Sequence, residues 1–194
     1  MCENEILRRR REMMAKKTGL TLLFGAYNET VVAGQSINTG IMLFDTNKSW
    51  TILIDITITS APPSGNGSAY KLIMVWDSVS AHNTLVFGKN QAGVNQYHFF
   101  WMGNDMTPSN MSSSVARKRV LVTHEANSDT VNLYYKSGNG LLYNATNTYT
   151  FVATTGKTLF GSSVAKSGLP GGTIEKAEIW NYDFSADEIS AFFE

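Results

Sequence analysis

The stretch at residues 50–59 constrains the fold of this chain more than any other. It reads Trp-Thr-Ile-Leu-Ile-Asp-Ile-Thr-Ile-Thr, so its isoleucines recur with the period of two that a β-strand requires. The isoleucines that share one face are Ile52, Ile54, Ile56 and Ile58. Because a face made of isoleucine is stabilised by removal from water, we predict that a second layer of the protein covers it.

Short apolar segments of the same kind follow at close intervals, separated by loops rich in Gly, Asn and Ser. We predict further strands at residues 20–24, 70–76, 84–87, 96–102, 119–124, 130–135, 141–143, 149–152, 158–160 and 174–182. A four-residue connection, residues 126–129, should close a hairpin. Strands and helices do not alternate, which favours an antiparallel sandwich over an α/β fold. A length of 194 residues suits one such domain.

The last part of the chain predicts a strand followed by a capped helix. Ser185 can accept a hydrogen bond from the backbone N–H of Glu188, and the Glu188 side chain can reach back, which is the capping-box arrangement. The apolar face of this helix would be Ile189, Phe192 and Phe193. We expect Ile174, Ile179 and Trp180 of the preceding strand to fill the sandwich core.

Three stretches resemble laminin-G-like, concanavalin A-like jelly rolls. Residues 172–181 fit G-x-I-x-x-x-x-I-[WY]-N, and residues 184–189 fit [FL]-S-x-x-E-I. Asp45-x-x-x-Ser49-Trp50 is similar to the entry of that family's first long strand, and the hairpin at 119–135 is similar to a laminin-G hairpin. The resemblance implies an all-β, two-sheet antiparallel jelly-roll sandwich over residues 20–194, used for carbohydrate or protein recognition.

Residues 1–19 lie outside that resemblance, and we predict an N-terminal α-helix there. Residues 1–17 carry six Lys or Arg against three Glu, whereas the rest of the chain carries ten basic and thirteen acidic residues. A helix with so thin an apolar stripe is marginally stable in isolation. It should pack on the sandwich, on a second subunit or on a larger assembly. Its anchoring residues would be Ile6, Leu7, Arg10, Met13 and Met14. A solvated helix is the alternative; nucleic acid is disfavoured because no aromatic residues interleave with the basic run.

Catalytic chemistry finds little support in the sequence. Glycan hydrolysis needs two carboxylates at a defined separation, but no glutamate lies between Glu29 and Glu125. The acids in that interval are single and scattered: Asp45, Asp55, Asp77 and Asp105. The single cysteine, Cys2, excludes an internal disulfide framework, and the three histidines stand at no triad or zinc spacing. We predict a protein that is not an enzyme.

No cofactor is predicted, although calcium stays open because many laminin-G-like domains bind it. The weak candidates are Asp77 and Asp105, with Asn104 beside them. Sugar binding would use aromatic rings for stacking and polar side chains for hydroxyl groups. The candidates are Trp76, Asp77, Tyr97, His98, Trp101 and Asn104. For Trp76 and Trp101 the alternative is a place in the core, and for His98 it is a half-exposed position on a sheet.

The overall organisation resembles a structural or adhesive bacteriophage protein: a lectin-like sandwich with no signal peptide and a short basic head. That resemblance implies a homo-oligomeric virion protein, assembled in the host cytoplasm, which binds a host-surface glycan and is anchored to its own copies or to other virion proteins through residues 1–18. No stretch is long enough to cross a membrane. The alternatives are a cellular carbohydrate-binding module or adhesin and, more remotely, a glycan hydrolase.

Overall fold

The computed structural model describes residues 20–41, 43, 47–59, 69–74, 84–89, 95–101, 104–106, 117–137, 143–148, 158–161 and 168–194. The predicted N-terminal helix lies outside these residues. The proposed anchoring residues Ile6, Leu7, Arg10, Met13 and Met14 lie outside them as well.

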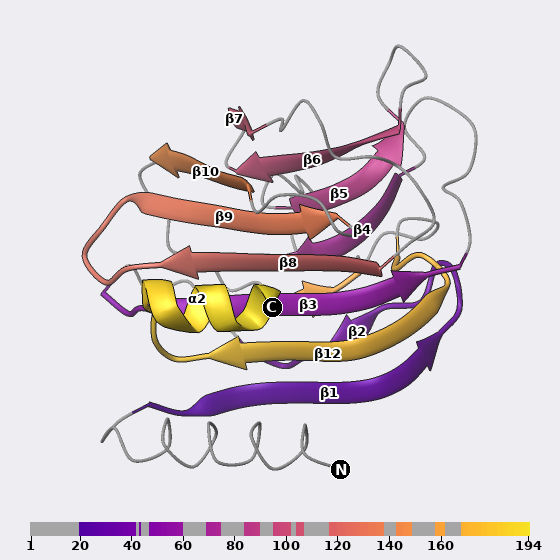
Figure 1. Ribbon diagram of the computed structural model, residues 1–194, viewed down its shortest axis with the longest axis horizontal. Coiled ribbons are helices and arrows are strands. Elements are labelled where there is room, and N and C mark those ends of the chain that lie inside the picture. Colours follow the sequence, from indigo (N-terminus) through magenta and orange to yellow (C-terminus); the bar gives the residue numbers. More distant parts are fainter. Residues whose placement is uncertain are drawn as a thin grey trace.

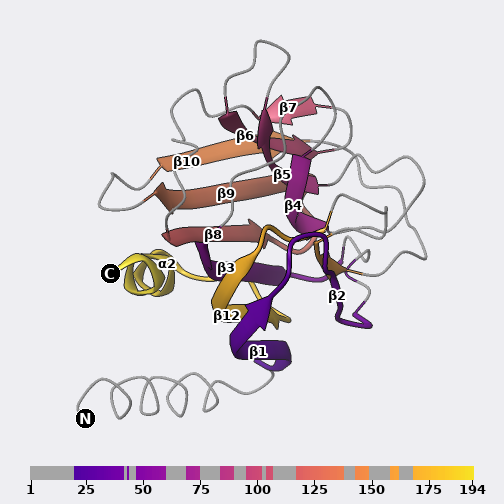
Figure 2. The same cartoon turned by 90° about the vertical axis from the view of Figure 1, so that its right-hand side faces the viewer.

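The described chain forms two antiparallel sheets and one helix, which confirms the predicted all-β sandwich (Figures 1 and 2). Sheet A has six strands in the order β1 (Leu22–Val31), β12 (Gly172–Trp180), β3 (Trp50–Ile58), β8 (Arg117–His124), β9 (Thr130–Ser137) and β10 (Tyr143–Thr148). Sheet B has six strands in the order β2 (Ile37–Asn38), β11 (Leu159–Phe160), β4 (Ala69–Met74), β5 (Thr84–Lys89), β6 (Asn95–Trp101) and β7 (Asn104–Met106). The helix is α2 (Ala186–Phe193).

The predicted strands differ from the structure in several places. β1 extends to Val31, well beyond the predicted 20–24, and the short strands β2 and β7 were not predicted. β8 ends at His124 and β9 begins at Thr130, so the hairpin connection has five residues rather than four, and Asn127 within it adopts a left-handed φ of 60°. β10 runs from Tyr143 to Thr148, where the prediction ended a strand at residue 143. The strand predicted at 149–152 falls outside the described residues.

The core between the two sheets is built on the isoleucine face of β3, as predicted. Ile52, Ile54 and Ile56 are fully buried, and Ile58 is 1% exposed. Sheet B contributes Leu72, Ile73 and Phe160 to the same cluster, and Phe24 of β1 contacts Phe160 with ring centroids 5.8 Å apart. The hydrophobic effect of this shared burial holds the two sheets together.

A second apolar cluster lies on the opposite face of sheet A, under α2, which lies in front of β3 and runs along it in Figure 1. Its buried members are Leu53, Leu121, Trp180, Tyr182, Phe184, Ile189 and Phe193. Trp180 is buried as expected, but in this second cluster and not between the sheets: neighbouring residues of a strand point to opposite faces, and Ile179 takes the side that faces sheet B. β3 is consequently buried on both faces.

The predicted capping box at the start of α2 is confirmed. The backbone N–H of Glu188 donates to Ser185 Oγ at 3.4 Å, and the backbone N–H of Ser185 donates to Glu188 Oε2 at 2.8 Å. The last turn of α2 contains no basic residue, and sheet A supplies the cations instead. Arg119 and Lys136 donate to the carbonyl oxygens of Phe192 and Phe193, which favours the negative end of the helix dipole.

We predict that Ser185→Ala lowers the free energy of unfolding by about 1 kcal/mol, the usual worth of an N-cap hydrogen bond. Chemical denaturation would measure it. The matched control is Ser190→Ala, an exposed serine in the same helix whose side chain takes no part in the N-terminal cap. Equal losses in the two variants would contradict a specific role for the cap.

Candidate functional site

Four of the six predicted sugar-binding residues lie on two paired strands at the edge of sheet B. Tyr97, His98 and Trp101 belong to β6, and Asn104 begins β7. Trp101 is the register partner of Asn104, and two residues separate them in the chain. The fold therefore brings an indole-bearing and an amide-bearing residue to the same end of two neighbouring strands.

Trp76 and Asp77 lie outside the described residues, but the strands on either side of them are placed. β4 ends at Met74, which pairs with Thr84 of β5, and Thr84 pairs in turn with Phe100 of β6. The β4–β5 connection and the β6–β7 connection therefore begin at neighbouring positions on the same end of sheet B. Of the weak calcium candidates, Asn104 and Asp105 are consecutive in β7, and the described residues contain no group of three or more His, Cys, Asp or Glu side chains that could hold a metal ion.

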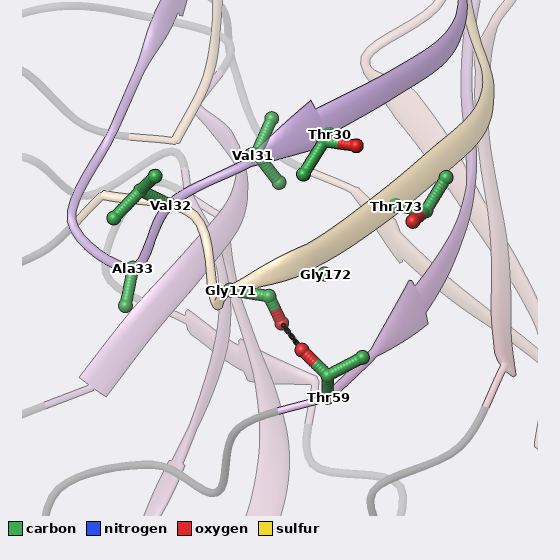
Figure 3. A pocket seen from close by; sticks show the side chains of 8 residues that line it. All are labelled: Thr30, Val31, Val32, Ala33, Thr59, Gly171, Gly172 and Thr173. Atoms are coloured by element: carbon green, nitrogen blue, oxygen red, sulfur yellow. Dashed lines mark hydrogen bonds between the residues drawn. The ribbon is translucent and has the colours of Figure 1, made fainter.

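A separate hollow of about 370 Å³ opens where β1 and β3 end and β12 begins (Figure 3). Its lining consists of Thr30, Val31, Val32, Ala33, Thr59, Gly171, Gly172 and Thr173. No ionisable side chain lines it, so the hollow offers apolar contact and threonine hydroxyl groups rather than acid–base chemistry. In Figure 1 these strand ends lie on the right, whereas β6 ends on the left, so the hollow and Trp101 belong to opposite ends of the sandwich.

Close backbone packing fixes the walls of the hollow. A Cβ atom on Gly172 would lie 2.0 Å from the carbonyl oxygen of Thr57, so only glycine lets β12 approach β3 there. Gly171 O accepts from the Thr59 backbone N–H at 2.9 Å and from Thr59 Oγ1 at 3.2 Å. Sequence reasoning missed this hollow; the Gly-Gly pair before the last strand was its one local signal.

The buried carboxylates of sheet A are held by fixed partners. Asp55 receives two hydrogen bonds from Arg117, at 2.8 and 2.7 Å, in a bidentate pair. Glu178 is fully buried, and its carboxylate accepts from the Tyr27 hydroxyl group and from Trp180 Nε1, the latter at 2.9 Å. The Lys176 ammonium group lies 3.1 Å from the same carboxylate. These contacts hold the fold together, and neither acid lines the hollow.

His124 and Lys118 are the buried basic residues of β8. His124 is fully buried and stacked on Trp50 with ring centroids 5.4 Å apart. Its Nδ1 lies 3.1 Å from Lys48 O and its Nε2 lies 2.8 Å from Ser128 O, so the ring joins the loop before β3 to the β8–β9 hairpin. Lys118 is also fully buried, and loss of hydration lowers the pKa of its ammonium group to about 8.

Lys118 should make stability depend on pH. The pKa of Lys118 is about 8 in the folded protein, against 10.5 for an ordinary lysine, so between these values the unfolded chain binds more protons and the free energy of unfolding rises with pH. We predict that Lys118→Met abolishes this rise between about pH 8 and 10, as measured by urea denaturation at several pH values. The exposed-residue control Lys48→Met should retain it. Burial raises the pKa values of Tyr134 and Tyr182, so these two hydroxyl groups lose their protons only above the usual pH range of tyrosine.

Comparison with known proteins identifies the fold. No protein family model matches this sequence, and a search of curated proteins found no match. Among solved structures, the chain is similar to the carbohydrate-binding module CBM40 of a Ruminococcus gnavus sialidase bound to α2,3-sialyllactose: the TM-score is 0.60 at 15% identity, over 88% of this chain and 98% of that chain. The same module bound to α2,6-sialyllactose matches with a TM-score of 0.60 at 16% identity, over 90% of this chain and 100% of the other.

In comparisons with whole enzymes, this chain matches only one part of the enzyme. A leech intramolecular trans-sialidase gives a TM-score of 0.57 at 16% identity, over 88% of this chain but 28% of the enzyme. Identities of 15–16% show a shared sandwich fold and do not place the chain in a family. None of these three structures is described as a virion protein, so the virion setting stays a prediction. No helix in the described ranges is long and apolar enough to cross a membrane.

Proposed function

We propose that this protein is a carbohydrate-binding module, a sandwich that recognises a glycan without cleaving it. One observation carries the proposal: nearly the whole chain superposes on isolated modules that were solved with sialyllactose bound, with 88–90% of this chain covered. This supports the alternative predicted from sequence, a cellular carbohydrate-binding module or adhesin, more directly than it supports a virion protein. Sialylated oligosaccharides are accordingly the first ligands to test.

The binding residues that we propose lie at the end of sheet B where β6 pairs with β7. A pyranose presents polarised C–H groups on one face, which are attracted to the electron-rich face of an indole such as that of Trp101. The paired position is Asn104, whose amide can both donate to and accept from hydroxyl groups. The hollow at the other end of the sandwich has no aromatic residue in its lining, so it is the weaker candidate for sugar stacking.

The virion setting is a further proposal about where such a module is displayed. It depends on residues 1–18 binding another particle protein, whereas a module of a cellular protein needs no such contact. Co-purification of the full chain with phage particles would favour the virion setting.

We predict that Trp101→Ala weakens binding of 3′-sialyllactose at least about tenfold, because stacking of one sugar ring on an aromatic side chain is lost. Titration followed by NMR would measure the dissociation constant for each chain. Lactose, which lacks the sialic acid, should bind more weakly than 3′-sialyllactose. Asn104→Ala should weaken binding less than Trp101→Ala.

Val32→Lys serves as the matched control, because Val32 is 71% exposed and lies at the opposite end of the sandwich, in the hollow. A monovalent sugar reports affinity for each chain whatever the oligomeric state, so this variant should bind like the unmodified protein. Melting temperatures of all variants would separate a lost contact from a lost fold. Loss of binding in Val32→Lys alone would move the site to the hollow, and absence of binding on an array of sialylated and neutral glycans would refute the proposed function.

A further inference from the structure

Among residues whose exposure the structure describes, the exposed large apolar side chains lie in β1 or directly after it. Leu22 and Leu23 begin the strand with 37% and 38% of their surface exposed, and Val32 directly follows its end with 71% exposed. Wherever else the structure describes the exposure of a large apolar side chain, that side chain is buried or half-buried. An apolar surface concentrated on one strand marks an interaction surface more strongly than apolar residues scattered singly.

Among the described strands, β1 is also an edge strand of sheet A. In the order of that sheet, β1 pairs only with β12, while the strand at the other edge, β10, contacts β7 of sheet B. β1 spans ten residues and contains neither proline nor lysine, the residues that commonly protect such an edge from pairing. Its only charged residue is Glu29.

The two ends of β1 complement each other. The strand begins with two leucines that project apolar surface, and it ends at the apolar hollow lined by Val31, Val32 and Ala33 (Figure 3). If two copies of β1 lie antiparallel about a twofold axis near Tyr27, Leu22 and Leu23 of each copy come next to Val31 and Val32 of the other. Every contact then occurs twice, as a twofold interface requires.

We propose that β1 is a homodimer interface, in which Leu22 and Leu23 of one copy pack against the hollow at Val32 of a second copy. Asn28 has a left-handed φ of 55°, which interrupts regular pairing in the middle of the strand. The contact is therefore placed at the two ends of β1, where the apolar residues lie.

Sedimentation velocity of the full chain over a range of concentrations tests this proposal. We expect a reversible dimer. Its dissociation constant should rise at least about tenfold in Leu23→Lys and in Val32→Lys, because each substitution occurs in both copies and places two unpaired charges in the interface. The double variant Leu23→Lys with Val32→Glu should regain dimerisation, since each lysine then faces a glutamate of the partner. The control Lys48→Glu, an exposed change away from β1, should leave the dimer unchanged.

A cross-linking experiment locates the contact. In a Cys2→Ser background, mixing the Leu23→Cys and Val32→Cys variants should give a disulfide-linked heterodimer faster than either variant alone. A protein that is monomeric at all concentrations, a dimer insensitive to both lysine variants, or no rescue by the double variant would overturn the proposal. Sugar affinity for each chain is measured separately, so the dimer and the proposed function fail independently.

Discussion

The structure depends on the burial of both faces of one strand. The isoleucines of β3 need sheet B on one side, and Leu53 of the same strand needs α2 on the other. Sheet B and α2 are therefore both held by apolar contact with sheet A, and its strands β3, β8 and β12 contribute residues to both clusters. The hydrogen bonds at the end of α2 orient the helix, but they lie at the edge of the apolar cluster. The apolar contacts therefore hold the helix on the sheet, and the hydrogen bonds adjust its position.

The parts of the fold that could be predicted from sequence are those fixed by neighbouring residues. The isoleucine alternation of β3 and the capping box of Ser185 and Glu188 depend on spacing within ten residues, and both are confirmed. The side of the sheet taken by Trp180 depends on a bulge between Ile174 and Lys176, which shifts the alternation, and on a helix that creates a second layer. Neither follows from periodicity alone.

The candidate site was predictable only as a set of residue types. The aromatic and amide residues of β6 and β7 could be chosen from sequence, whereas the pairing of Trp101 with Asn104 needed the register of sheet B. The hollow could not be foreseen, because its walls come from residues 30–33, 59 and 171–173, which only the folded chain brings together. The acids Asp55 and Glu178 are held in ion pairs or hydrogen bonds, which explains why acids present in the sequence need not form a catalytic pair.

The place of β12 has a consequence for how the protein is made. This strand lies between β1 and β3, although residues 172–180 follow those strands by more than a hundred positions in the chain. The strands of sheet A therefore cannot all pair while the ribosome is still adding the residues before β12. Until β12 is made, β1 has no described neighbour in its sheet. Contacts of such large sequence separation slow folding. A nascent chain halted before residue 172 would expose two strand edges at once, the form of the protein most prone to aggregate.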